Sequence, residues 1–177
     1  MNKKSINDVV AWKDVFDAKS QPVELPNPQY WTHVQFRRFT TCPMCNLHLR
    51  QYAKRYETVK DAGVRTIAVF SSRLDAVKEL QAELPFILVS DPDENLYGQF
   101  CVEKSIMAIL HPATIVPGIR GAIKHGMKIP KKGDRKLGLP ADFLINTDGV
   151  IKAVKYGIHA YDQWSLDELL QILKRVR

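Results

Sequence analysis

The sequence predicts an α/β fold built on a central mixed, mostly parallel sheet with helices on both faces. Strand-like and helix-like segments alternate between residues 31 and 89, as they do in parallel sheets with crossover helices. A hairpin signal between residues 143 and 156 adds an antiparallel pair. The length of 177 residues fits one domain, so we expect residues 1–177 to form a single unit.

The first half of the chain supplies the parallel strands. Residues 31–36, 64–70 and 86–89 are short apolar runs rich in β-branched and aromatic side chains, which is typical of buried strands. Residues 46–61 and 74–84 lie between them and have helical spacing. Because parallel neighbours need a crossover connection, this order predicts three parallel strands joined by helices.

The second half predicts shorter elements. Residues 91–93, Asp-Pro-Asp, form a turn signal before a helix over residues 96–100. The sequence Asn-Thr-Asp-Gly at 146–149 predicts a hairpin of residues 143–145 and 150–156. Ser165 and Glu168 have the spacing of a capping box in front of an apolar helical pattern, so we expect the chain to end in a helix.

Two segments lie outside this pattern. Residues 5–19 have apolar side chains at approximately helical spacing, which predicts a helical N-terminal extension over about residues 1–28. Residues 104–138 contain three prolines and five glycines, and up to residue 136 they carry eight Lys or Arg against one Asp. We interpret them as a solvated basic insertion with one or two short helices, such as 106–110. The rest of the chain is neutral, so this insertion accounts for the net charge of +7.

The motif Cys42-Pro43-Met44-Cys45 carries the chemistry. It follows a predicted strand and begins a predicted helix, where unpaired N–H groups and the helix dipole stabilise a thiolate. Pro43 suits the first turn, because the N–H that it lacks would have no partner there. We predict that Cys42, nearer the helix start, is the nucleophile and that Cys45 is the resolving thiol. Such a dithiol can exchange with disulfides or reduce a peroxide through a sulfenic acid.

From about Gln29 onward, the sequence resembles the thioredoxin superfamily and, within it, the peroxiredoxin-like AhpC/TSA proteins. The resemblance rests on the CxxC motif after a strand, on PFILVSDPD at 85–93 and on LPADFLINTDG at 139–149. It implies a thioredoxin-like fold and a redox-active, antioxidant protein that needs no cofactor and no metal. It also implies that Leu139 and Pro140 bind substrate, with a cis Leu139–Pro140 bond that packs Pro140 against Cys42.

The sequence departs from the peroxiredoxin pattern at the peroxide-activating positions. Gln35 and Phe39 stand where that family has a proline and a Ser or Thr, and Pro140 stands where an arginine is expected. Candidates to take over this role adjoin the motif: Arg37, Arg38, Thr40 and Thr41. We therefore expect a peroxiredoxin-like thiol–disulfide oxidoreductase. A thiol-dependent peroxidase is the first alternative, and a non-enzymatic redox-sensing or binding domain is the second.

Other cysteines and histidines have simpler interpretations. His48 and the two motif cysteines could contribute to a zinc site, which would need Cys101 or His111 from elsewhere. No second CxxC motif supports this site, so we predict no metal. We interpret Asn46 and His48 as helix-surface groups and Cys101 as a small buried apolar residue.

Partners and location follow from the same features. We expect electrons from a thioredoxin or glutaredoxin system or from glutathione, and a disulfide or hydroperoxide as substrate. The basic insertion lacks interleaved aromatic residues and nucleic-acid motifs, so we predict no nucleic-acid binding. The N-terminal residues contain no apolar run of the kind that a signal peptide or membrane anchor needs. An odd number of cysteines, three, does not suit the disulfide framework of a small secreted protein. We therefore expect a cytoplasmic protein without membrane contact, and the sequence leaves a homodimer open.

Overall fold

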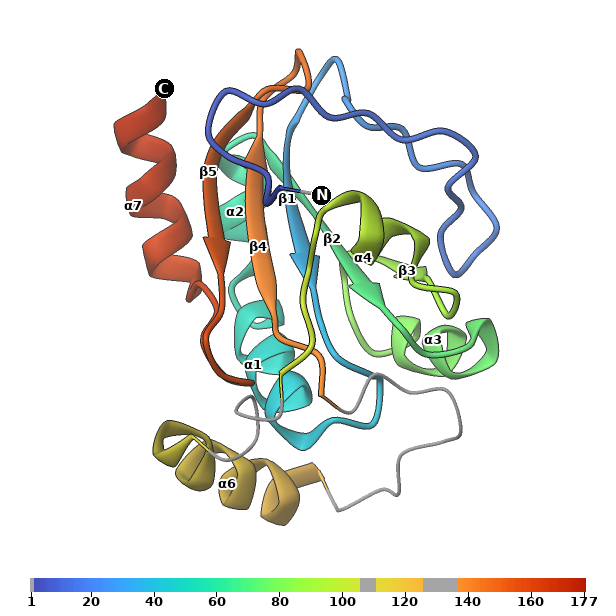
Figure 1. Ribbon diagram of the computed structural model, residues 1–177, viewed down its shortest axis with the longest axis vertical. Coiled ribbons are helices and arrows are strands. Elements are labelled where there is room, and N and C mark those ends of the chain that lie inside the picture. Colours follow the sequence, from blue (N-terminus) through green and yellow to red (C-terminus); the bar gives the residue numbers. More distant parts are fainter. Residues whose placement is uncertain (1, 106–110, 126–136) are drawn as a thin grey trace.

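The computed structural model describes residues 2–105, 111–125 and 137–177. Its centre is a five-stranded sheet in the order β3-β2-β1-β4-β5 (Figure 1). The strands are β1 (Trp31–Phe36), β2 (Val64–Phe70), β3 (Ile87–Ser90), β4 (Ala141–Ile145) and β5 (Ile151–Tyr156). Strand β2 runs parallel to β1 and β3, whereas β4 is antiparallel to β1 and β5. The predicted mixed sheet, its three parallel strands and its hairpin are confirmed.

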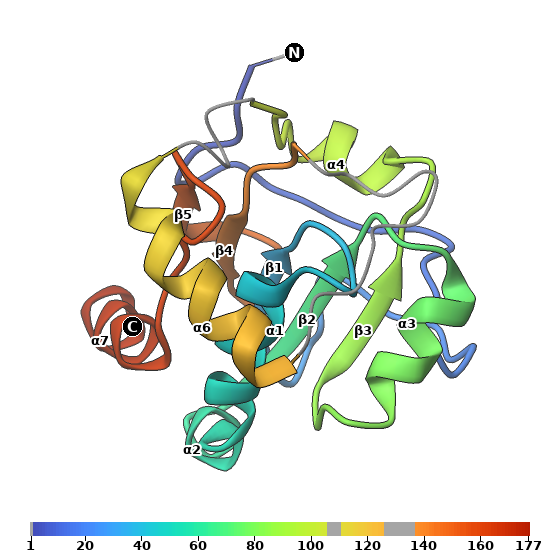
Figure 2. The ribbon, with the colours of Figure 1, turned by 90° about the horizontal axis from the view of Figure 1, so that it is seen from below.

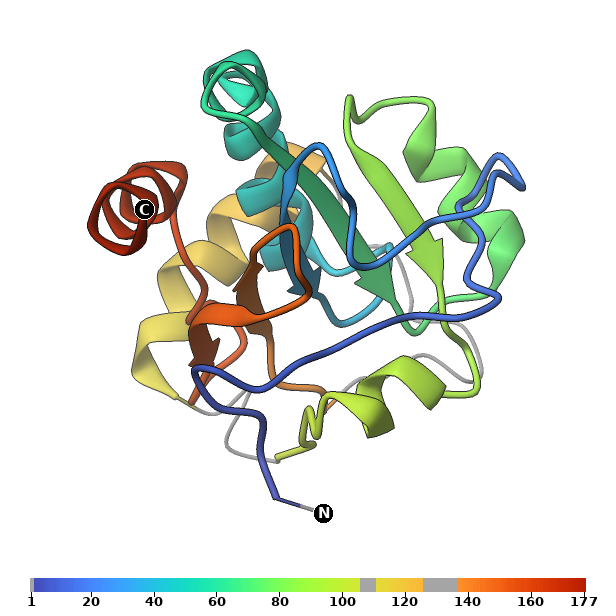
Figure 3. The same cartoon turned by 90° about the horizontal axis from the view of Figure 1, so that it is seen from above.

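Helices cover both faces of this sheet. They are α1 (Pro43–Ala53), α2 (Tyr56–Asp61), α3 (Leu74–Gln81), α4 (Asn95–Gln99), α6 (Ile115–His125) and α7 (Leu166–Val176), with a 3₁₀ turn η1 (Pro112–Thr114) before α6. One face buries apolar side chains of α1, α2, α3 and α7, including Leu49, Val77 and Leu169. The other face packs against α4 and the N-terminal segment through Trp12, Leu25 and Phe100, and Figure 3 shows these two layers from above.

The N-terminal segment is extended, so the predicted helix over residues 5–19 is wrong. Asn7 and Asp14 have φ angles of 76° and 56°, and residues in this left-handed region interrupt a helix. The backbone bonds instead to the main body, because the N–H of Asn7 donates to the carbonyl of Ile151 and that of Ala18 to Leu88. The segment therefore runs as a strap from edge strand β5 to edge strand β3 (Figure 1).

The remaining elements match the sequence in part. The region predicted as one helix over 46–61 is two helices, α1 and α2. The helix predicted at 96–100 is α4, and the final helix begins with the expected capping box, in which Ser165 and Glu168 each accept the other's backbone N–H. The predicted helix at 106–110 lies outside the described residues. Within the residues described, no helix has the length and apolarity to cross a bilayer.

The basic segment contains α6, a helix of 11 residues whose position and length were not predicted. Pro117, Gly118 and Gly121 disfavour an isolated helix, which is why the pattern indicated an irregular insertion. Tertiary packing overrides this preference, since α6 lies across α1 at the lower end of the sheet (Figure 2). At Gly121 a Cβ atom would lie only 2.5 Å from the carbonyl oxygen of Pro43, so the close approach of the two helices requires glycine.

Candidate active site: a buried dithiol at the start of α1

The two motif cysteines lie at the beginning of α1. Cys42 is the N-cap residue, and its sulfur accepts the backbone N–H of Cys45 at 3.4 Å. Both cysteines are free, and their side chains are hydrogen-bonded to each other. Their exposed fractions are 0% and 1%. Pro43 occupies the first turn as predicted. The pair can therefore close a disulfide, but substrates cannot reach it from bulk solvent in this conformation.

Polar contacts fix the loop that precedes Cys42. The side-chain amide of Asn46 donates to the carbonyls of Thr40 and Cys42, and the hydroxyl of Ser72 accepts the N–H of Thr40 at 3.0 Å. Asn46 and His48 are both buried, so their interpretation as helix-surface groups is wrong. A buried amide that bonds two carbonyls of the loop holds Cys42 in its capping position. Ser72 lies two residues after β2, and nothing in the sequence indicated this role.

The charge of the dithiol depends on its shared proton and on Arg38. A hydrogen bond from the Cys42 side chain lowers the pKa of Cys45 to about 6, against the effect of burial and with help from the Arg38 guanidinium. Burial raises the pKa of Cys42, and so does its interaction with Cys45. One Nη of Arg38 lies 3.7 Å from the Cys42 sulfur. Arg38 and the interaction between the two sulfurs therefore favour a single thiolate within the pair.

Surrounding side chains complete the enclosure of the sulfurs. Cys42 and Cys45 belong to a small apolar cluster with Phe39, Met44 and Ala160, the last from the loop between β5 and α7. The hydroxyl oxygen of the neighbouring residue, Thr41, is buried and has no hydrogen-bond partner among the described residues. Among the described residues, no cluster of three or more His, Cys, Asp and Glu side chains could hold a metal ion.

Comparison with known proteins places this site in a family. A model of the AhpC/TSA family matches residues 11–154, which is most of the chain. The chain belongs to the AhpC/TSA family. It is thus an oxidoreductase that acts on peroxides or thiols, as the sequence predicted. No curated protein matches it in sequence.

Solved structures show that this AhpC/TSA protein has the thioredoxin-like fold of peroxiredoxins. Peroxidoxin BcpB from Mycobacterium tuberculosis aligns with a TM-score of 0.69 at 15% identity, covering 97% of each chain. A mutant of PrxQ from Xylella fastidiosa aligns with a TM-score of 0.68 at 13% identity, covering 99% of this chain and 96% of that one. AhpC from Mycobacterium bovis gives 0.66 at 16% identity, covering 98% and 93%. The predicted fold class is confirmed.

Behind the dithiol, this AhpC/TSA protein buries a charged network that the sequence analysis missed. The carboxylate of Asp142 on β4 accepts from Arg37 at 2.8 Å and contacts His33 at 3.0 Å, and all three side chains are fully buried. Gln35 accepts a further hydrogen bond from Arg37 at 2.7 Å. Burial opposes ionisation of Asp142, but Arg37 and His33 outweigh it and hold the pKa of this carboxyl below its usual range. Arg37 therefore supports the strand beneath the site, whereas Arg38 reaches the sulfur.

The peptide bond before Pro140 differs from the cis bond that the family resemblance implied. The one cis peptide among the described residues joins Leu25 to Pro26, so the Leu139–Pro140 bond is trans and the predicted cis bond is wrong. The trans form is held by pairing on both sides: the N–H of Leu139 donates to Glu103, and the carbonyl of Pro140 accepts from Gly157. Both residues line a cavity of about 340 Å³. Their role in substrate binding stays a prediction.

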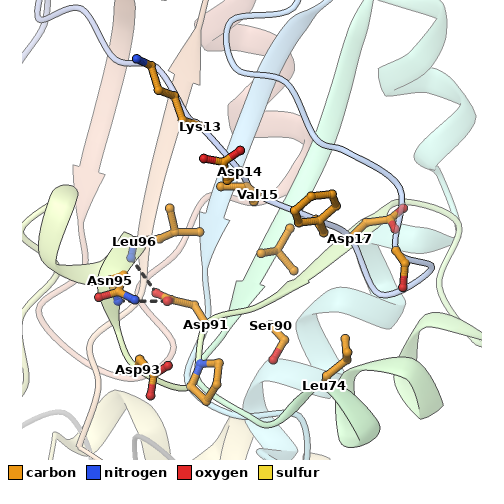
Figure 4. Close-up of a pocket in the computed structure, with 14 residues that line it drawn as sticks. Lys13, Asp14, Val15, Asp17, Leu74, Ser90, Asp91, Asp93, Asn95 and Leu96 are labelled. Carbon is orange, nitrogen blue, oxygen red and sulfur yellow. Dashed lines mark hydrogen bonds between the residues drawn. The ribbon is translucent and has the colours of Figure 1, made fainter.

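Two other features lie apart from the AhpC/TSA dithiol. A cavity of about 460 Å³ lies between the N-terminal strap, the end of β3 and the start of α4 (Figure 4). Its central carboxylate, Asp91, already accepts three backbone N–H groups of α4, so a structural role accounts for it. Cys101 is partly exposed, contrary to its interpretation as buried, and its thiol donates to the carbonyl of Asn2.

Proposed function

We propose that this AhpC/TSA protein is a thiol–disulfide oxidoreductase that cycles between the Cys42–Cys45 dithiol and its disulfide. The observation that carries the proposal is the geometry at the start of α1, where the Cys42 sulfur accepts the N–H of Cys45 at 3.4 Å and lies 3.7 Å from an Nη of Arg38. The pKa of Cys45 is lowered to about 6 by its hydrogen bond with Cys42, which favours one thiolate within the pair, and a thiolate is the species that attacks a disulfide. The proposed location stays the cytoplasm, where such pairs are kept reduced.

Cys42 is the proposed attacking sulfur. Moving the shared proton to Cys45 puts the charge on Cys42, where Arg38 and the N–H of Cys45 stabilise it. The Cys42 thiolate then forms a bond to one sulfur of the substrate disulfide, and the other substrate sulfur leaves as a thiolate. Cys45 attacks Cys42, releases the second substrate thiolate and leaves the protein oxidised. A reductant such as thioredoxin, glutaredoxin or glutathione returns two electrons.

Reduction of small hydroperoxides is the second candidate function. The burial of both sulfurs favours a small substrate, and the Thr41 hydroxyl, which has no partner within the described part of the chain, can hydrogen-bond a peroxide oxygen. In this reaction Cys42 attacks one oxygen, the O–O bond breaks, and the leaving alkoxide takes a proton to become an alcohol. Cys45 then attacks the sulfenic acid on Cys42 and releases water, which yields the same disulfide.

Single-cysteine variants test both candidates. With hydroxyethyl disulfide and glutathione as substrates, we expect Cys42→Ser to lose turnover and Cys45→Ser to accumulate a mixed disulfide that mass mapping locates on Cys42. Cys101→Ser serves as the matched control and should retain turnover. Alkylation that labels Cys45 faster than Cys42 at pH 7 would reverse the assigned roles. Peroxide consumption faster than that of a free thiol, combined with slow disulfide exchange, would favour the peroxidase.

A further inference from the structure

Helix α6 presents an apolar ridge to solvent. We give this name to its four exposed aliphatic residues, whose exposed fractions lie between 54% and 82%: Ile115, Val116, Ile119 and Ile123. Their spacing places them within about a third of the helix circumference. Arg120 and Lys124 are exposed next to this ridge. An aliphatic stripe with basic neighbours is costly to leave in water, so it is typical of a surface that binds another molecule.

The opposite face of α6 packs on the first turn of α1, beside the dithiol. Gly121 packs onto the carbonyl of Pro43, the residue between the two halves of the redox motif, and no side chain separates the helices there. Arg120 is close enough to Tyr161 to affect its pKa, and Tyr161 packs against the apolar cluster around the sulfurs. Figure 2 shows α6 in front of α1 when the molecule is viewed from this end. A protein that approaches the dithiol from this end therefore meets α6 first.

We propose that α6 is the docking and gating element for a protein dithiol, whose own surface combines an apolar patch with an acidic rim. This inference rests on the proposed function, and it names the class of reductant. Charge selects this occupant over a second copy, because two chains of net charge +7 would bring like-charged helices together. Docking on the ridge displaces α6 from Pro43 and exposes the sulfurs.

The electron transfer then follows ordinary exchange chemistry. A thiolate of the partner attacks one sulfur of the Cys42–Cys45 disulfide and forms an intermolecular disulfide, while the other sulfur leaves as a thiolate. The second thiol of the partner loses its proton and displaces the first sulfur. The partner ends as a disulfide, and this protein has gained two electrons and holds the pair with its shared proton.

The ridge is tested on the reduction step alone. The disulfide is formed with diamide, and its reduction is followed with thioredoxin, with glutaredoxin and with dithiothreitol, so that no peroxide or disulfide substrate enters the assay. For Ile119→Asp and Ile123→Asp we expect the faster protein reductant to lose about tenfold or more in rate, with the dithiothreitol rate unchanged. Arg120→Glu should slow the same protein reductant and weaken its salt dependence.

Glycine variants of α6 test the gate independently. Gly121→Ala places a Cβ against the carbonyl of Pro43 and should move α6 away from α1. We expect a small alkylating agent to label Cys42 and Cys45 several-fold faster in this variant. Gly118→Ala is the matched control, because a Cβ there meets nothing within 4 Å, and its labelling should match wild type. Circular dichroism of each variant verifies that the fold is retained.

Several results would overturn the proposal. Ridge variants that both protein reductants reduce as fast as wild type would remove α6 from the docking surface. The same holds if neither protein reductant exceeds dithiothreitol. If the ridge variants lose only binding to vesicles of phosphatidylglycerol and phosphatidylcholine, the occupant is a lipid surface; if they lose only self-association in the ultracentrifuge, it is a second copy. Absence of disulfide turnover in the wild type, with its reduction still dependent on the ridge, would instead contradict the proposed function but not the docking surface.

Discussion

Two neighbouring arginines, Arg37 and Arg38, have different electrostatic partners near the dithiol. Successive side chains of an extended segment point to opposite sides. Arg37 therefore pairs with Asp142 on the neighbouring strand β4, whereas Arg38 approaches the sulfur of Cys42. Both are buried, so neither can be replaced without a change in the local field. Arg38 is the residue that couples the protein's charge to the reactivity of the pair.

Replacing Arg38 should therefore raise the pH at which the dithiol ionises. The Arg38 guanidinium lowers the pKa of both cysteines, so we expect Arg38→Met to move the titration midpoint upward by about one unit, which costs about tenfold in thiolate below that midpoint. Thiolate absorbance at 240 nm as a function of pH measures the shift. Arg38→Lys keeps the charge and should shift the midpoint less, and an unchanged midpoint in Arg38→Met would contradict the assignment.

Part of the site could be predicted at this scale. The CxxC motif and its position at a helix start identify Cys42, Cys45 and Pro43 without a structure, because the motif is local. The buried network was missed because Asp142 is 109 residues away from His33. A signal existed nonetheless: His33, Gln35 and Arg37 alternate along a predicted buried strand, and polar side chains on one face of such a strand need a partner.

At the scale of elements, local signals predicted α7 well and α6 poorly. The cap of α7 is formed by two residues close together in the sequence, Ser165 and Glu168. Helix α6 instead depends on the contact between Gly121 and the carbonyl of Pro43 in α1. The N-terminal segment failed for a related reason. Its apolar spacing approximated that of a helix. Its conformation is instead decided by long-range backbone hydrogen bonds to β5 and β3.

The cap of α7 can be measured directly. We expect Ser165→Ala to reduce the free energy of unfolding by ~1 kcal/mol, because the N–H of Glu168 loses its acceptor at the helix start. Urea unfolding monitored by circular dichroism gives the change. Ser165→Asp retains an acceptor and a favourable charge at the N-terminus, so it should stay close to wild type. Equal stability of the alanine variant and wild type would show that the exposed cap is dispensable.

For the whole molecule, buried histidines make stability depend on pH. Burial lowers the pKa of His33 and of His48, the latter to about 3. On acidification the two histidines of the unfolded chain bind protons near pH 6.5, whereas those of the folded chain stay neutral to lower pH. The free energy of unfolding is therefore highest above pH 6.5 and falls below it, by up to ~1.4 kcal/mol per pH unit for each histidine. Asp142, with its lowered pKa, adds a loss in the same direction below about pH 4.

Urea unfolding at pH 7, 6, 5 and 4.5 measures this dependence. His48→Phe removes one of the two histidines, and since the ring packs beside Tyr52 and Tyr161, phenylalanine fills a similar space. We expect the variant to lose less stability than wild type between pH 6.5 and 4.5. Parallel pH profiles for the two proteins would show that His48 does not take part.

The strap across the sheet has a consequence for the protein outside its chemistry. An open sheet ends in two strands whose backbone groups can pair with those of another chain, and such edges promote aggregation. Here a single segment bonds to β5 near its start and to β3 at its other end. Residues 7–18 thus occupy part of both edges, and this coverage disfavours edge-to-edge pairing of the sheet with another chain.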